Sequence, residues 1–418
     1  MNLYIADTAN QRVREVTGGT FVSVSPDPWV YIGSGDFNAD GTPDLLWWNR
    51  TTGLVAIWLM DPNSPGNTKS ITFPAAPDPT IWKILGIGDF NGDGTADIVL
   101  QDQKLGDSAY GLVAMWLMDP SNPGRIKSTT FPKTLDPTTY KLLGIGDFDG
   151  NGTADLAWRY VKPGDPQNGL VAMWLMDKNH AGVINTIDFP GTADPSIWTL
   201  TAIADFDGNG TADLAWQDQK LGDSSFGLVA MWMMSSTTPG AVSAFAFPGG
   251  LNLTTWHWLG IGNFDASSTD ATADLLWQDL NPTDSNDGLA GMWLMSPTSA
   301  GTYQVTFPGT AGSASWALLG IADLNGDGTA DLIWQDVNPA DSTYGLVGIW
   351  IIHNGVRQIA VFPGSPNPSQ WQFVGLLSPY STTHTDANLV WRNVLTGQVD
   401  DWVIANGNLS TVTSPGNA

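Results

Sequence analysis

One acidic, glycine-containing decapeptide recurs five times along this chain, at intervals of more than fifty residues. GDFNGDGTAD at 88–97 is followed by GDFDGNGTAD at 146–155, ADFDGNGTAD at 204–213 and ADLNGDGTAD at 322–331, and GDFNADGTPD precedes them at 35–44. Counted from its first aspartate, each copy has oxygen-bearing side chains at positions 1, 3, 5 and 9, and a threonine carbonyl at position 7. Alternating oxygen ligands suit a hard divalent cation that takes about 6–8 of them, and a glycine at position 6 permits the sharp turn.

These nine positions match the opening of an EF-hand loop, but the glutamate at position 12 is missing, and we expect the aspartate at position 9 to replace it. Asn and Asp exchange between positions 3 and 5, yet every copy keeps three carboxylates. A constant count of three is what a divalent-cation site needs and what an ordinary Asp-Gly turn does not. We therefore predict about five bound Ca²⁺ ions. The predicted ligands are Asp36, Asn38, Asp40, Thr42, Asp44, Asp89, Asn91, Asp93, Thr95, Asp97, Asp147, Asp149, Asn151, Thr153, Asp155, Asp205, Asp207, Asn209, Thr211, Asp213, Asp323, Asn325, Asp327, Thr329 and Asp331.

Two further copies have decayed. NFDASSTDATAD at 263–274 is longer and lacks the glycine, and SPYSTTHTDAN at 378–388 has lost most of its oxygen ligands. We predict that neither binds a metal ion. Helical calcium modules of the dockerin type are an alternative for the intact loops, but strand-like patterns on both sides of each loop argue against them.

The loops belong to a longer repeat of seven units, with steps of 53, 58, 58, 58, 60 and 55 residues. The second unit contains four short β-branched and aromatic runs, separated by Gly, Pro, Asp and Asn, at 82–90, 96–102, 111–119 and 127–131. Seven such units predict an all-β fold, a seven-bladed β-propeller of four-stranded antiparallel blades with the acidic loop between strands 1 and 2. A linear solenoid is the rival architecture, although its repeats are usually shorter than ~50 residues.

The chain has 21 tryptophans, and most recur at a fixed place in the repeat. One follows the acidic loop in six units, and another lies in the Gly-led apolar run of all seven. These indole rings could stack on sugars or pack between adjacent blades. Packing between blades requires a fixed strand position in every unit, and we favour this interpretation.

The composition disfavours several kinds of partner and excludes some chemistry. The formal net charge is −25 with only 16 Lys and Arg, which disfavours nucleic acid and anionic membrane surfaces as partners. No cysteine is present, so disulfide, thiol and thiolate-metal chemistry is excluded. No apolar run is long enough to span a membrane. The first residues lack the features of a signal peptide, so a secreted protein would be represented here by a mature form or a fragment.

The units resemble FG-GAP/VCBS repeats, the calcium-loop blades of integrin α-chain propellers, of a mushroom lectin and of many secreted bacterial proteins. The resemblance covers roughly residues 27–418. It implies calcium at positions 1, 3, 5, 7 and 9 of each intact loop and an extracellular or cell-surface location. It does not imply one function, because propellers perform many unrelated ones.

Residues 1–26 depart from the repeat and resemble one NHL-type propeller unit, with strands expected near 3–7, 12–17 and 20–25. This segment is a remnant of a preceding domain, an extra strand that closes the ring, or an edge that pairs with another chain. The unit beginning at Ser378 already offers an outer strand at 408–413. We therefore expect two parts, residues 1–26 and the propeller at 27–418.

The connection between strands 2 and 3 is longer in units two to six than in units one and seven. In a propeller these loops open on the face opposite the acidic loops, and loops on a rigid scaffold often carry function. Tyr110, Phe226 and Tyr344 in them could stack on a sugar, but we favour hairpins whose aromatic ring covers the strand below.

No catalytic set converges in the sequence. The four histidines share no repeat position, no G-x-S-x-G motif occurs, and no two of the 40 aspartates are singled out as a glycosidase pair. We expect a non-enzymatic, lectin-like or adhesive binding module for glycan or protein. A self-assembling structural protein of filament or surface-layer type, with itself as partner through the N-terminal strands, and a polysaccharide-active enzyme are the alternatives.

Overall fold

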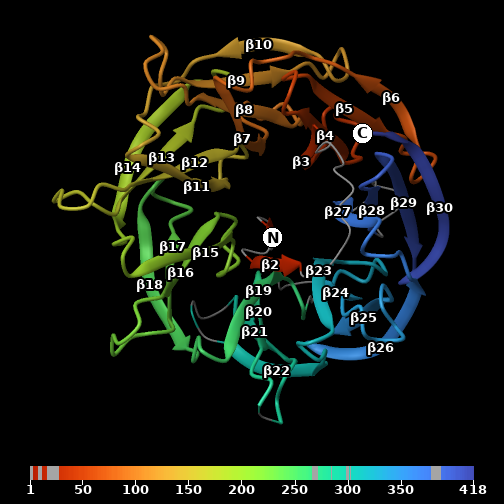
Figure 1. Cartoon of the computed structure of the whole chain (residues 1–418). Coiled ribbons are helices and arrows are strands. Elements are labelled where there is room, and N and C mark those ends of the chain that lie inside the picture. The colour runs from red at the N-terminus through yellow and green to blue at the C-terminus, as the bar shows by residue number, and fades with distance from the viewer. Residues whose placement is uncertain are drawn as a thin grey trace.

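The computed structural model describes residues 3–7, 12–16, 28–265, 272–283, 285–297, 301, 303–377 and 387–418. Seven four-stranded sheets form a ring around a central axis, and each sheet is built from four consecutive strands (Figure 1). All pairs within a sheet are antiparallel, and no helix occurs in the described ranges. The prediction of a seven-bladed propeller is confirmed, and the alternative of a linear solenoid is excluded because the blades form a ring.

The first strand of each blade lies nearest the axis and the fourth forms the outer rim (Figure 1). Blades 1 to 4 consist of β3 (Trp29–Gly35), β4 (Asp44–Asn49), β5 (Val55–Met60) and β6 (Thr68–Thr72); β7 (Trp82–Gly88), β8 (Asp97–Asp102), β9 (Val113–Met118) and β10 (Ile126–Thr130); β11 (Tyr140–Gly146), β12 (Asp155–Tyr160), β13 (Leu170–Met176) and β14 (Ile184–Thr192); and β15 (Trp198–Ala204), β16 (Asp213–Asp218), β17 (Leu228–Met234) and β18 (Val242–Gly250). Blades 5 to 7 consist of β19 (Trp256–Gly262), β20 (Asp274–Asp279), β21 (Leu289–Met295) and β22 (Tyr303–Thr310); β23 (Trp316–Ala322), β24 (Asp331–Asp336), β25 (Val347–His353) and β26 (Val356–Gly364); and β27 (Trp371–Leu377), β28 (Asn388–Asn393), β29 (Gln398–Ala405) and β30 (Asn408–Asn417).

The middle two strands of each blade are buried on both faces, which explains why they read as continuous apolar runs. In blade 2, every residue of β8 and β9 is buried, whereas β10 on the rim is largely exposed. Seven hydrophobic clusters form the core, and each joins side chains of two neighbouring blades. Among the described residues, the core therefore consists of the seven interfaces between blades.

Tryptophans fill these interfaces, as predicted. Trp158 and Trp174 are about 1 % exposed, and their ring centroids lie 5.2 Å apart. Equivalent pairs recur in blades 1, 4, 5, 6 and 7, at 5.2–5.5 Å. Aromatic contacts of this kind add stability beyond the area they bury. Blade packing thus accounts for these indole rings.

The ring closes between blades 7 and 1 without exchange of strands. Blade 7 supplies its own outer strand, β30, as predicted for 408–413. Thr68 Oγ1 donates to the carbonyl of Pro415 at 2.9 Å, and Ser34 Oγ donates to that of Leu376 at 3.4 Å. Tertiary contacts like those of the other interfaces therefore hold the ring shut.

Two of the three strands expected before residue 26 are present. β1 (Leu3–Asp7) and β2 (Arg12–Val16) pair antiparallel in a separate two-stranded sheet. The third, expected near 20–25, lies outside the described residues. The division of the chain at residue 26 stays a prediction.

Candidate metal centres

The five intact loops each connect strand 1 to strand 2 of a blade, at one end of the ring. The predicted ligands at positions 1, 3, 5 and 7 lie in the connection, and the ligand at position 9 is the first residue of strand 2. All five predicted residues of each loop are thus brought together by one tight turn, in blades 1, 2, 3, 4 and 6.

Position 1 organises the turn through its carboxylate. In blade 3, Asp147 Oδ2 accepts from the amide of Gly152 at 2.8 Å, and Oδ1 accepts from that of Gly150 at 2.7 Å. The bond from position 6 recurs in all five loops at 2.7–2.9 Å. Gly150 and Gly152 have φ values of 72° and 86°, a left-handed conformation that favours glycine. The glycine at position 6 was predicted from the sequence, whereas the left-handed conformation at position 4, where blade 1 has Ala39 at φ 55°, was not.

The aspartate at position 9 also has a structural role, which was not predicted from the sequence. Asp155 is fully buried, and its Oδ2 and Oδ1 accept from the backbone amides of Phe148 and Met176 at 2.9 and 2.7 Å. The same two bonds occur in six blades, including blade 5, where Asp274 serves a decayed loop. This aspartate therefore ties strand 2 to strand 3 whether or not its loop keeps the other ligands.

Burial also disfavours the ionised form of the aspartate at position 9. The pKa of Asp155 is raised to about 8, mainly by burial and also by the nearby Asp149 and Asp147 carboxylates, while the hydrogen bonds from the two amides lower it. The equivalent aspartates of blades 1, 2 and 4 also reach about 8, and that of blade 6 about 7. A divalent cation among these oxygens would offset both the burial and the repulsion.

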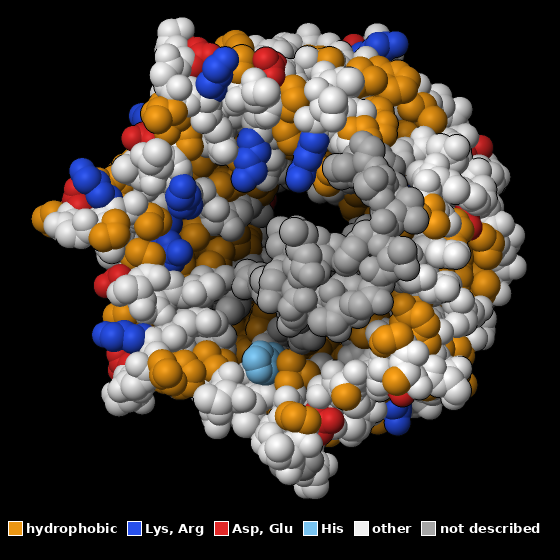
Figure 2. All heavy atoms as spheres, in the orientation of Figure 1, with side chains coloured by type: hydrophobic (Ala, Val, Ile, Leu, Met, Phe, Trp, Pro, Cys, Tyr) orange, Lys and Arg blue, Asp and Glu red, His pale blue; other side chains and the backbone are white. Residues whose placement is uncertain are grey.

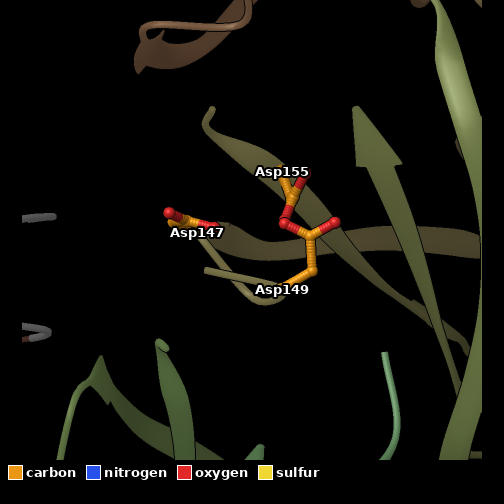
Figure 3. Close-up of side chains that lie close together, drawn as sticks. All are labelled: Asp147, Asp149 and Asp155. Carbon is orange, nitrogen blue, oxygen red and sulfur yellow. The ribbon is translucent and has the colours of Figure 1, made fainter. Parts of the chain in front are cut away.

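Positions 3 and 5 occur in two arrangements. In blades 3 and 4 the aspartate is at position 3, and the carboxylates of positions 1, 3 and 9 each place an oxygen within 4.8 Å of the others. Figure 3 shows Asp149 and Asp155 side by side, with Asp147 across the turn from them. In blades 1, 2 and 6 the aspartate is at position 5, and its carboxylate does not join such a cluster.

The donor set fits a hard cation. The loops offer carboxylate, amide and backbone carbonyl oxygens in a tight turn, and no cysteine thiolate is available anywhere in the chain. Calcium takes 6–8 oxygens in flexible geometry, whereas softer transition metals favour imidazole and thiolate. The Asp-rich groups could therefore hold a metal ion, and their chemistry fits Ca²⁺.

Neighbouring loops are joined directly. The carbonyl of position 1 accepts from the amide that precedes position 9 in the next blade, as in Ala212 N to Asp147 O at 2.7 Å. Four further bonds of this kind, at 2.6–2.8 Å, join blades 1 to 2, 2 to 3, 4 to 5 and 5 to 6. The loops thus form a hydrogen-bonded arc at one end of the ring.

The two decayed copies are only partly described, because residues 266–271 and 378–386 lie outside the described ranges. Whether they bind a metal stays a prediction. In blade 7 the position-9 residue is Asn388, which is 1 % exposed.

The strand 2–3 connections lie at the opposite end of the ring. They span 103–112 in blade 2 but only 50–54 in blade 1 and 394–397 in blade 7, as expected. Tyr110 is half-buried, and its hydroxyl donates to Asp136 Oδ1 at 3.2 Å. Phe226 and Tyr344 are half-buried too, and that these rings cover the strand below stays a prediction.

All lysines lie between Lys69 and Lys220. Figure 2 shows Lys and Arg side chains gathered over the part of the ring that blades 2 to 4 form. Aspartates balance part of this charge, because Lys162 and Lys220 lie 3.7 and 3.9 Å from Asp165 and Asp223. The region is therefore no basic patch of the kind that binds nucleic acid.

A hollow of about 200 Å³ lies between blades 3 and 4 and has a mainly aromatic lining. The lining residues are Trp198, Trp216, Trp232, Phe245, Phe247 and the segment 191–193. In blade 5 the corresponding place is taken by Tyr303, which stacks on Trp293 at 4.4 Å, and in blade 6 by Arg357, 4.5 Å from the ring of Trp350. The strand register puts Val242 there in blade 4, and valine is too short to cover the tryptophan.

Comparisons with known proteins agree with this architecture. The family described as FG-GAP-like repeat matches residues 36–100, which span the loops of blades 1 and 2. No curated protein sequence matches the chain. No helix in the described ranges could span a membrane.

Among solved structures, the fold is similar to that of prolyl oligopeptidase B from Galerina marginata, with a TM-score of 0.52, 11 % identity, and coverage of 93 % of this chain and 51 % of the other. It is also similar to that of a post-proline cleaving enzyme from Rickettsia typhi, with a TM-score of 0.51, 11 % identity, and coverage of 94 % and 53 %. The chain spans about half the length of these structures, and identities this low show the fold alone. The repeat match at residues 36–100 and the seven like blades support an FG-GAP repeat β-propeller.

Proposed function

We propose that the protein is a calcium-stabilised, extracellular propeller that binds a glycan or a protein and performs no catalysis. The observation that carries the metal part is the five-fold repetition of one loop geometry, in which the carboxylate at position 1 accepts from the amide of the glycine at position 6 in a turn that holds three aspartates. Five Ca²⁺ ions would bring the formal charge from −25 to −25 + 10 = −15. Millimolar calcium outside cells would fill sites with dissociation constants near 10⁻⁴–10⁻³ M.

Removal of calcium tests the first part. A ligand that binds only the folded state stabilises it by about 2.7 kcal/mol per site at 100 times its Kd. Excess chelator should lower the melting temperature, and added calcium should restore it, whereas magnesium at equal concentration should restore it less. An unchanged melting curve in chelator contradicts the proposal. Metal analysis of the calcium-loaded protein should give about five ions, and seven would show that the decayed loops also bind.

The aromatic hollow between blades 3 and 4 supports the binding-module part. Apolar concave surfaces with a few polar groups are the usual places for ligands. Val242→Tyr, which copies the residue of blade 5, should fill the hollow and abolish binding on a glycan array or to a captured protein ligand. Val242→Ile is the matched control and should leave binding intact. Equal binding by both variants would place the ligand elsewhere, and release of reducing sugars from polysaccharides would contradict the non-enzymatic part.

Self-assembly is a second candidate, favoured by the separate β1–β2 sheet. A two-stranded sheet has unpaired edges, which are templates for strands of another chain. Deletion of residues 1–20 should then reduce the assembly size measured by light scattering with calcium present. A full-length protein that stays monomeric at high concentration would exclude this candidate and leave the binding module.

A further inference from the structure

We infer that the aromatic hollow between blades 3 and 4 binds an aromatic ring of the tyrosine type, carried by a partner protein. This inference rests on the proposed function as a binding module and names the chemical group that the module recognises. The hollow lies where Trp232 of blade 4 approaches Gly191 at the end of β14 in blade 3. The next two interfaces repeat this pair of residue types, and there the chain's own side chains lie over the tryptophan.

The side chain at the interface of blades 4 and 5 is Tyr303. Its ring stacks on Trp293, with centroids 4.4 Å apart and an interplanar angle of 20°. It also reaches the glycine of this interface, since a methyl group added at Gly249 would lie 2.8 Å from the tyrosine hydroxyl oxygen. At the interface of blades 5 and 6 the guanidinium of Arg357 lies 4.5 Å from the ring of Trp350. The place over these tryptophans therefore suits a flat group that stacks.

Blade 4 lacks such a side chain and has an additional aromatic wall. In the strand register Val242 takes the position of the tyrosine and the arginine, and it is too short to cover Trp232. Phe245 pairs with Trp232 and lies edge-on to it, with centroids 5.9 Å apart. The residues at the place of Phe245 in blades 5 and 6 are Val305 and Ala360. Blade 4 is thus shaped to receive a ring that blade 5 supplies from its own strand.

The lining of the hollow favours a neutral ring over a guanidinium or a sugar. No carboxylate, side-chain amide or charged group lines it. Arg159 already lies nearby, because its Nη1 donates to the carbonyl of Trp198 at 2.8 Å and its Cζ is 5.6 Å from the ring of Trp216. A second cation would be repelled and would lose its hydration without gaining a partner. A sugar would find few of the polar groups that usually fix its hydroxyls.

The position of the hollow on the rim favours a ring that a larger partner carries. Phe245 and Phe247 border it and are 57 % and 58 % exposed. A protein that inserts a tyrosine would also cover these two rings, whereas a free phenol would leave them in water. Buried aromatic anchors surrounded by further apolar contact are typical of protein interfaces.

Ligand-observed NMR on the calcium-loaded full-length protein tests the inference, with p-cresol as the probe of the ring. p-Cresol should bind with a dissociation constant on the order of millimolar, as a fragment of this size does. Cyclohexanol, methylguanidinium and methyl β-glucoside should bind at least about ten-fold more weakly. Val242→Tyr should abolish the binding of p-cresol, and Val242→Ile, the matched control, should retain it.

A second variant tests the inference by moving the site. Tyr303→Val gives blade 5 the residue of blade 4, so adding it to Val242→Tyr should restore the binding that Val242→Tyr removes. Crystals soaked in p-bromophenol should show the bromine between blades 3 and 4 in the parent and between blades 4 and 5 in the double variant. Melting curves verify that each variant is folded, because Tyr303→Val also removes a stacked ring.

A short peptide distinguishes a protein partner from a free aromatic molecule. N-acetyl-Leu-Tyr-Leu amide, whose leucines can contact Phe245 and Phe247, should bind more tightly than p-cresol. Equal affinity overturns the assignment to a protein. Absent binding of p-cresol, binding that Val242→Tyr leaves unchanged, or a preference for methyl β-glucoside overturns the inference, while the proposed calcium binding and a ligand site elsewhere stand. If p-cresol binds as expected but the protein retains no glycan on an array and no tyrosine peptide, the proposed binding module is wrong and the assignment of the ring stands.

Discussion

Blade 7 carries a buried carboxyl where the other blades carry an apolar side chain. Asp401 lies in β29 and pairs with Val390, at the place that Met173 holds in β13 and Met231 holds in β17. It is fully buried, and burial raises its pKa to about 7, with Asn388 opposing the rise only in part. We predict that this residue makes the propeller less stable as the pH rises.

The sign follows from proton linkage. The folded pKa of about 7 lies above the ordinary value of 3.8, so between these values the folded protein holds a proton that the unfolded chain releases. The free energy of unfolding therefore falls as the pH rises from about 4 to 7 and levels off above. A difference of about 3 pKa units amounts to about 4 kcal/mol once the group is ionised in both states.

Asp401→Asn removes the titration and keeps the shape. Relative to the unmodified protein, this variant should gain about 3 kcal/mol of stability between pH 5 and pH 8, or about 3 °C in melting temperature for a chain of this size. Both proteins are measured in saturating calcium, so that the metal loops contribute equally. Asp400→Asn, at the half-buried neighbour, is the matched control and should show no such gain. A stability difference between Asp401→Asn and the parent that does not change with pH would refute the reasoning.

Three further outcomes follow from the loops. Ala39→Gly should raise the free energy of unfolding by about 1 kcal/mol, because Ala39 holds a left-handed φ of 55°, while Gly92→Ala at the same position of blade 2 should lower it; chemical denaturation measures both. Asp274→Asn should cost about 1–3 kcal/mol even in chelator, since one of its two buried amide bonds is lost, and an effect seen only with calcium would contradict the structural role. Tyr110→Phe should change the free energy of unfolding by less than about 0.5 kcal/mol, because the residue is only half-buried. A larger loss in a melting curve would show that the hydroxyl stabilises the fold.

The repeat made the fold predictable from the sequence. In the second unit, the strands expected at 82–90, 96–102 and 111–119 correspond to β7, β8 and β9, which are shorter by one to three residues, and the strand expected at 127–131 corresponds to β10, which begins one residue earlier. The excess comes from the first residues of loops, which have the same composition as strand ends but leave the ladder. Seven copies of one pattern make the blade boundaries evident, because the same residues recur at the same place in each unit.

The finer features of the sites were not predictable in the same way. Spacing gives the same ligand pattern for Asn91–Asp93 and Asp149–Asn151, and only coordinates reveal which way each amide points. The hollow depends on which rim residue lies over Trp232, and this requires the register of β17 and β18. Asp401 was visible in the sequence as an acidic residue at an apolar repeat position. Alignment of the seven units at their third strand would have identified it.

The decay of blade 5 separates two roles that the intact loops combine. Its loop has lost the glycine and the regular spacing, yet Asp274 still accepts from the amides of Phe264 and Met295 at 2.7 Å each. The carbonyl of Asn263 likewise still accepts from the amide of Ala330 in the next blade at 2.6 Å. What remains is the part that ties strand to strand and blade to blade, and what is gone is the part that would surround a cation. In the proposed function, metal binding would therefore depend on positions 3, 5 and 6, while positions 1 and 9 also serve the ring. Because the same turns carry both roles in the intact blades, loss of calcium there should loosen the contacts between blades as well as the loops.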